Sequence, residues 1–183
     1  MKTLLPLLAL LFLCTGCVTS RTPVGSKPAT LDPKVWNAKW LNADGGTLRT
    51  RIADPRLGII RISPSKGPLR DDGSRDILVR QLGLTTVANQ QYGSVYKFAR
   101  IDATTNHLLL FEPDQGVFVR LIDLGLVRGK ADRYTKGKPT GNLAIEGLSD
   151  RELRRIAGQG IDLRTLFQEN PSTVLIRYRW TPF

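Results

Sequence analysis

The chain has 183 residues, with 27 Lys and Arg against 16 Asp and Glu, a formal net charge of +11. This length is the size of one domain and is long enough to bury a substantial core. Two cysteines and one histidine exclude a fold held by several disulfides and a zinc site built from Cys and His, so side-chain packing must stabilise the chain.

The first sixteen residues, MKTLLPLLALLFLCTG, have the order of a secretory signal peptide. Lys2 precedes an apolar run over residues 4–13, and small residues stand at the expected cut. The apolar run is about ten to fifteen residues long, which is shorter than the roughly twenty that a transmembrane helix needs. We therefore expect export and removal of residues 1–16.

Cys17 directly follows Thr15 and Gly16, and this end of the signal resembles that of bacterial lipoproteins. Cys14 stands where that family usually has Leu, and Leu13 lies one position earlier. The resemblance implies that Cys17 is acylated and becomes the mature amino terminus, so that acyl chains hold the protein on a membrane. Val18 in place of Asp after the cysteine implies the outer membrane. The alternative is an ordinary cleaved signal with an unmodified Cys17.

The basic composition remains after the signal is removed, because residues 1–16 contain one Lys and no acid. Arg outnumbers Lys, and its planar donor fork pairs with carboxylates and phosphates. A basic protein at a membrane is attracted to anionic lipid, another polyanion or an acidic envelope protein. Because the signal indicates export, we expect no nucleic acid partner. The other interpretation is that the charge only keeps the domain soluble.

Residues 17–31 are expected to be a lipidated cysteine and a flexible tether. The segment 18–31, VTSRTPVGSKPATL, is rich in Pro, Gly, Ser and Thr and has little to bury. One globular domain over residues 32–183 is expected to follow. It starts at Asp32-Pro33, where Asp caps a helix and Pro fits the first helical position.

Short runs follow that either alternate in polarity or are apolar and β-branched, and both patterns are typical of β-strands. A first hairpin is predicted across the turn Asp54-Pro55-Arg56, and a second across the turn Pro113–Gly116. The predicted strands are 47–53, 57–63, 76–82, 84–88, 94–103, 106–112, 117–124, 143–147 and 173–180.

One helix is predicted near the C-terminus. Ser149 and Glu152 have capping-box spacing, and Leu153, Ile156 and Ala157 supply an apolar stripe. The glycines at 158 and 160 end this helix, and one more helical turn is predicted at 162–167.

These elements predict a mainly β (α+β) fold. The links between strands are too short for parallel crossovers, so we expect a curled antiparallel sheet, either a sandwich or a small barrel, with one short C-terminal helix before the last strand. Trp36 and Trp40 are expected in the core. The segment 36–40, WNAKW, resembles the Trp near the first strand of lipocalin-like barrels, with Ala38 where that family has Gly. This resemblance implies a carrier of a lipid or small apolar ligand.

Residues that could carry chemistry are few. His107 is the only histidine, and no nucleophile elbow occurs. Ser63 and Lys66 have the Ser-x-x-Lys spacing of penicillin-binding enzymes, but Pro64, Gly67 and Pro68 deny them a helix. We expect His107 to be a surface or edge-strand residue.

Two charged segments have ordinary interpretations. Asp71, Asp72 and Asp76 lack the ordered spacing of a calcium loop, and a solvated loop is expected there. The basic segment 129–141 lacks the P-loop pattern and is expected to be a surface loop, with a phosphate-rich partner as the alternative.

The sequence therefore favours a non-catalytic lipoprotein anchored in the outer membrane, with its domain in the periplasm, that binds or supports another envelope component. No catalytic residue, metal or cofactor is expected, and Cys17 is the one site residue. The alternatives are the lipocalin-like carrier and an envelope hydrolase, whose acids would come from Asp102, Glu112, Asp114 and Glu146.

Overall fold

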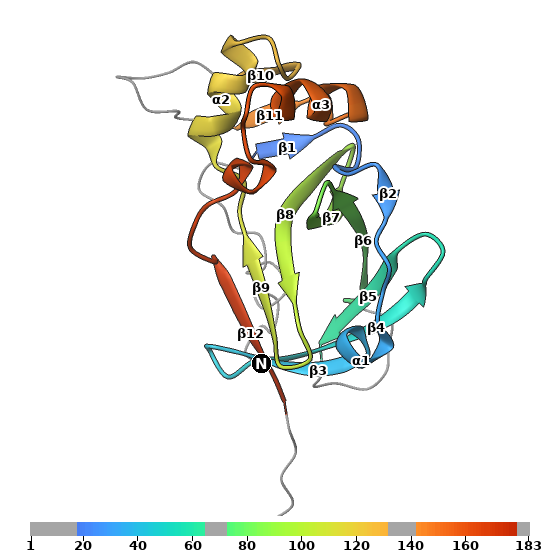
Figure 1. Ribbon diagram of the computed structural model, residues 1–183. Coiled ribbons are helices and arrows are strands. Elements are labelled where there is room, and N and C mark those ends of the chain that lie inside the picture. Colours follow the sequence, from blue (N-terminus) through green and yellow to red (C-terminus); the bar gives the residue numbers. More distant parts are fainter. Residues whose placement is uncertain (1–17, 65–72, 132–141, 179–183) are drawn as a thin grey trace, which may run out of the picture.

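The computed structural model describes residues 18–64, 73–131 and 142–178, and its main feature is a closed β-barrel (Figure 1). Eight antiparallel strands form it, each hydrogen-bonded to the next and the last to the first. They are β3 (Ala38–Asn42), β4 (Thr47–Asp54), β5 (Ile59–Pro64), β6 (Arg75–Leu82), β7 (Thr85–Tyr92), β8 (Val95–Ala103), β9 (His107–Phe111) and β12 (Thr173–Arg177). The prediction of a mainly β fold with a curled antiparallel sheet is confirmed, and the sheet is a barrel.

The strand β12 closes the barrel, although it comes from the far end of the chain. It lies between β9 and β3, with Leu175 opposite Leu108 on one side and Asn42 on the other. Closure pairs the edges that an open sheet would leave free for other strands.

Aromatic packing and one polar network stabilise the barrel interior. Trp40 is completely buried, and its indole Nε1 donates to the Thr50 hydroxyl at 2.8 Å. That hydroxyl in turn donates to the carbonyl oxygen of Trp36. The polar groups therefore satisfy one another inside an apolar core, and the expected core role of both tryptophans is confirmed.

The helix α1 (Pro33–Trp36) carries Trp36 into this interior. It starts as expected: the Asp32 carboxylate accepts from the backbone N–H of Lys34 at 2.9 Å, and Pro33 occupies the first turn. Arg177 of β12 holds the helix in place, because its Nη1 donates to the carbonyl oxygens of Lys34 at 2.7 Å and Thr105 at 3.0 Å.

A second layer packs on the barrel beside β8 and β9 (Figure 1). The strand β1 (Val18–Ser20) pairs antiparallel with β8 and parallel with β11 (Leu143–Ile145), which pairs with β10 (Gly129–Ala131). Three helical segments complete the layer: α2 (Gln115–Asp123), α3 (Asp150–Gly158) and the 3-10 helix η2 (Leu163–Leu166). Phe98 of β8 packs edge-to-face against Phe118 and Phe167, with ring centroids 5.8 and 6.3 Å apart, in a second core that also contains Val18.

Residues 18–31 are not the expected tether. Beyond β1, the strand β2 (Lys27–Pro28) pairs with β6. Val24 is completely buried, and the Asn89 side chain bonds to its backbone, accepting from its N–H at 2.7 Å and donating to its carbonyl oxygen at 3.0 Å. The Pro- and Gly-rich composition suggested a tether, but Asn89 of β7 and the strand β6 form hydrogen bonds with the backbone of this segment. The folded part therefore includes residues 18–31.

The predicted strand at 117–124 is wrong, because this segment belongs to α2. The Asp114 side chain accepts from the backbone N–H of Val117 at 3.0 Å and caps the helix. Phe118, Val119 and Leu121 are buried along one side. The apolar residues of this segment are so frequent that they fit both the two-residue period of a strand and the 3.6-residue period of a helix. The N-cap at Asp114 favours the helix.

The other C-terminal predictions are confirmed. Ser149 and Glu152 form the capping box of α3, and η2 provides the extra helical turn. The predicted last strand is β12, which ends at Arg177, and residues 179 and 180 of that prediction lie outside the described residues. Within the described residues, no helix is long and apolar enough to cross a membrane.

We expect Gly58 to be required for the close packing of residues 28–29 against β6. At its φ of +67°, an added Cβ would lie 2.5 Å from the Val79 carbonyl oxygen and 3.2 Å from the Ala29 nitrogen. These two atoms hydrogen-bond to each other at 2.9 Å. We expect Gly58→Ala to lower the free energy of unfolding by about 1–3 kcal/mol in denaturant titration. Gly45→Ala is the control, since Gly45 has a φ of +76° but no atom within 4 Å. Equal losses in both variants would contradict the packing role.

Candidate functional site

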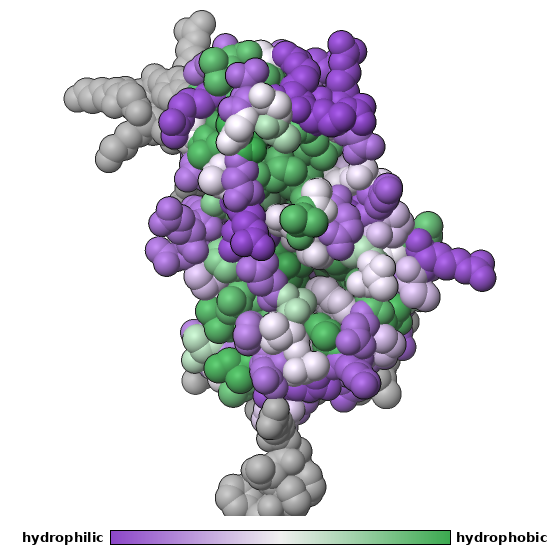
Figure 2. All heavy atoms as spheres, viewed as in Figure 1, coloured by the Kyte–Doolittle hydropathy of each residue, from purple (hydrophilic) through white to green (hydrophobic). Residues whose placement is uncertain are grey.

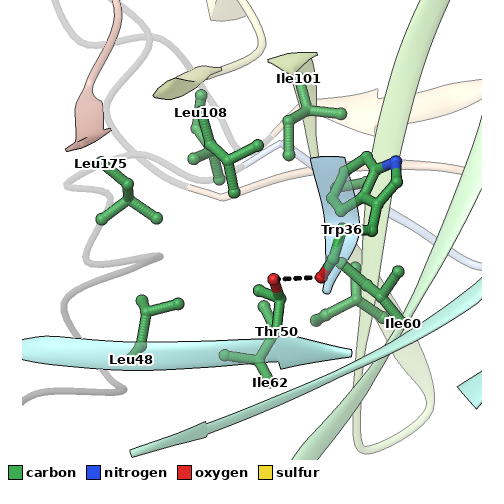
Figure 3. Close-up of a pocket in the computed structure, with 11 residues that line it drawn as sticks. Trp36, Leu48, Thr50, Ile60, Ile62, Ile101, Leu108 and Leu175 are labelled. Atoms are coloured by element: carbon green, nitrogen blue, oxygen red, sulfur yellow. Dashed lines mark hydrogen bonds between the residues drawn. The ribbon is translucent and has the colours of Figure 1, made fainter. Parts of the chain in front are cut away.

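The interior of the barrel is the first candidate site (Figure 3). Residues from α1 and from seven of the eight barrel strands point into it, and all but one are apolar. The lining consists of Trp36, Leu48, Thr50, Ile60, Ile62, Ile77, Ala88, Ile101, Leu108, Leu110 and Leu175. The single polar group, the Thr50 hydroxyl, is engaged between Trp40 and the Trp36 carbonyl.

The space left between these side chains is about 20 Å³. A water molecule needs roughly 10–15 Å³ measured in the same way, and a drug-sized ligand occupies a pocket of about 300–1,000 Å³. The barrel is therefore filled by its own side chains, and in this conformation it has room for about one water molecule.

A polar groove on the second layer is the second candidate site. It has a volume of about 490 Å³ and runs between the chain just after β1 and the connection from β11 to α3. Its lining consists of Thr22, Pro23, Gly25, Ser26, Arg128, Glu146, Gly147, Leu148, Ser149, Asp150 and Glu152.

Three charged groups of the groove, Arg128, Glu146 and Glu152, lie close together. The Arg128 Nε lies 3.4 Å from Glu146 Oε2 and 3.8 Å from Glu152 Oε1. The other oxygen of Glu152, Oε2, accepts hydrogen bonds of 2.9 Å from the backbone N–H and the hydroxyl of Ser149. Burial raises the pKa of Glu152, but the bonds from Ser149 and the adjacent Arg128 outweigh it and hold the pKa below its ordinary value. This arrangement stabilises the start of α3.

The four acids considered for a hydrolase do not meet at one site. Asp102 lies on the outside of β8, 3.5 Å from Arg100, and Asp114 caps α2. Glu112 lies between them in the chain, and only Glu146 lines the groove. Acid–base catalysis by two carboxylates needs them to flank one bond, and these four are not arranged in that way.

The remaining candidates have local roles where the structure describes them. The His107 Nδ1 lies 3.2 Å from the Thr104 hydroxyl at the start of β9. Asp76 belongs to β6, and the Arg61 guanidinium hydrogen-bonded to it at 2.7 and 2.9 Å lowers its pKa. Ser63 lies in β5. Cys17, Lys66, Asp71, Asp72 and residues 132–141 lie outside the described residues.

Across residues 18–64, 73–131 and 142–178, no group of three or more His, Cys, Asp or Glu side chains is placed to hold a metal ion. The sequence did not predict the groove, because the residues that line it are far apart in the chain. The capping-box pair Ser149 and Glu152 was recognisable, but its contact with Arg128 was not.

Replacing Glu152 should destabilise the protein in a pH-dependent way. Because its pKa is lowered on folding, its charged form contributes stability above the pKa of the unfolded chain, and that contribution disappears as pH falls through the folded pKa. We expect Glu152→Gln to lower the midpoint temperature of thermal unfolding at pH 7. Below pH ~4 the midpoint temperature of the variant should approach that of the wild type. A difference that stays constant between these pH values would contradict this role.

The two sites differ in what they offer chemically. The interior offers apolar surface and almost no space, and the groove offers space with polar and charged walls, where Arg128 lies between Glu146 and Glu152. No model of a known protein family, no curated protein and no solved structure matches this chain.

Proposed function

We propose that this protein is a non-catalytic lipoprotein of the outer membrane, anchored by acyl chains on Cys17, whose periplasmic domain binds or supports another component of the cell envelope. The observation that carries the proposal is the position of β1. This strand begins at Val18, immediately after the cysteine of the lipoprotein-like signal, and it lies between β8 and β11.

Because of this position, an anchor on Cys17 would be joined directly to a paired strand of the domain. Val18 and Ser20 are buried, and Val18 belongs to the second core. A strand paired on both sides has few free backbone groups and resists local opening. Acyl chains on Cys17 would therefore hold the domain directly at the bilayer.

The filled barrel supports binding at the surface over carriage in the interior. About 20 Å³ of free space leaves no room for an apolar ligand of ordinary size. A rigid body with a packed core suits a scaffold, because its surface residues keep fixed relative positions.

The anchor is tested by exchanging each cysteine in turn. We expect Cys17→Ser to abolish the lipid adduct found by mass spectrometry and to move the protein out of the outer-membrane fraction. Cys14→Ser is the matched control, since it removes the other thiol of the same signal and should leave the adduct in place. Membrane association that is equal in the Cys17→Ser variant and the wild type would contradict the proposal.

A lipocalin-like carrier is the second candidate, favoured by the closed apolar barrel and by the placement of Trp36 at its interior. Our leading proposal predicts that gentle isolation from membranes followed by native mass spectrometry finds only the anchor lipid. A second apolar molecule bound at one per chain, and lost in a variant that fills the interior such as Ala88→Leu, would favour the carrier instead.

A further inference from the structure

The outer face of β12 is more apolar than a solvated barrel wall should be. Leu175 points inward and is buried, whereas Val174, Ile176 and Tyr178 are 42%, 58% and 39% exposed. A half-buried strand normally turns its polar residues outward. Two exposed aliphatic residues on this strand and an exposed tyrosine directly after it, all at alternate positions, therefore need an explanation beyond folding.

Neighbouring strands extend this apolar surface. Leu109 of β9 lies opposite Val174, and Leu41 of β3 lies opposite Ile176, so both lie on the same outer face. Both are half-buried. We call Leu41, Leu109, Val174, Ile176 and Tyr178 the β12 stripe. Figure 2 shows hydrophobic side chains at the lower left of the molecule, in the region where Figure 1 shows β12.

A row of cations borders the β12 stripe. The Lys39 Nζ lies 4.1 Å from the ring centroid of Tyr178, and Lys39 stands opposite Arg49 in the sheet. Arg51 follows on the same face of β4, and both arginines are exposed. Within the part of the chain that the structure describes, neither arginine lies within 4.0 Å of a carboxylate oxygen, although the charge of Arg51 also acts on Asp76 and helps to lower its pKa. We call Lys39, Arg49 and Arg51 the basic row.

The β12 stripe is connected to the anchored end of the fold. Leu109 packs against the second core, and that core contains Val18, the first residue after Cys17. From Val174 to Tyr178 the strand covers about 13 Å, at roughly 3.3 Å per residue. The stripe thus leads from the layer that holds the anchor to the basic row.

We propose that the β12 stripe and the basic row form a surface that lies against the anionic phospholipid headgroups of the anchoring membrane. This inference rests on the proposed lipid anchor. Apolar side chains enter the interface between headgroups and acyl chains, and adjacent Lys and Arg side chains attract anionic lipids. Exposed aliphatic side chains, a tyrosine and exposed arginines lie together on this face, and anionic headgroups bind such a combination.

The contact is tested with a thiol label on the lipidated full chain. Once Cys17 is acylated and residues 1–16 are removed, a cysteine introduced elsewhere is the sole free thiol. Ile176→Cys places an environment-sensitive fluorophore on the stripe, and Leu84→Cys places it on a fully exposed residue of the β6–β7 hairpin as control. In vesicles of phosphatidylethanolamine and phosphatidylglycerol with brominated acyl chains, we expect several-fold stronger quenching at position 176.

The basic row is tested in the same vesicles. Arg49→Gln with Arg51→Gln should reduce the fraction of protein whose label at position 176 contacts the bilayer. For each charge removed, we expect the ratio of contacting to detached protein to fall about fivefold. Arg154→Gln with Arg155→Gln is the control, since it removes the same charge from the exposed side of α3. Equal effects of the two pairs would overturn the role of the basic row.

Failure of this inference is distinguishable from failure of the anchor. Equal quenching at positions 176 and 84, in protein that carries the lipid adduct and remains on the vesicles, overturns the surface and leaves the anchor intact. A missing adduct overturns the anchor. A label at 176 that is accessible to a water-soluble quencher on vesicles but shielded in native envelope membranes also overturns the lipid contact, and assigns the stripe to a protein partner.

Discussion

The pairing of β1 is the constraint that relates this fold to its proposed function. Three residues next to Cys17 form a strand with partners on both sides: Thr19 pairs with Lys97 of β8 and with Ala144 of β11. The backbone N–H of Arg21 then bonds to the carbonyl oxygen of Ile145 at 3.0 Å, which continues the contact. The N-terminal segment is thus part of the sheet, and any group attached to Cys17 is attached to a rigid body.

The barrel gives that body its stiffness. Eight strands close on themselves, and the interior is occupied by Trp36, Trp40 and aliphatic side chains. Such a packed interior resists deformation, because moving one side chain displaces its neighbours. The binding that we propose would therefore take place on the outer face of the barrel or on the second layer.

Local signals in the sequence were sufficient for many of the elements. The capping box of Ser149 and Glu152 predicted α3, and Asp32-Pro33 predicted α1. The hairpin of β4 and β5 followed from an alternating run and a β-branched run on either side of one turn. Each of these features depends on residues that are close in the chain, so propensity and periodicity describe them well.

The features that the sequence did not predict depend on contacts between residues that are far apart in the chain. The segment 18–31 is ordered because Asn89, 65 residues beyond Val24, bonds to its backbone, and composition contains no trace of that contact. The alternation of β12 indicated two faces, but its partners β9 and β3 decide that Leu175 points inward. The groove around Arg128 was likewise invisible, because the fold brings its walls together. The sequence therefore predicted the class of fold well and the candidate surfaces poorly.

The central claim is that the membrane anchor leads directly into a folded sheet, and the height of the domain above the bilayer tests it. Neutron reflectometry on the lipidated protein in a supported bilayer measures the hydrated space between headgroups and protein. Our account expects protein density to begin at the headgroups, with no water layer between them. A flexible tether of fourteen residues would reach up to roughly 45 Å, and a hydrated gap approaching that distance would contradict the account.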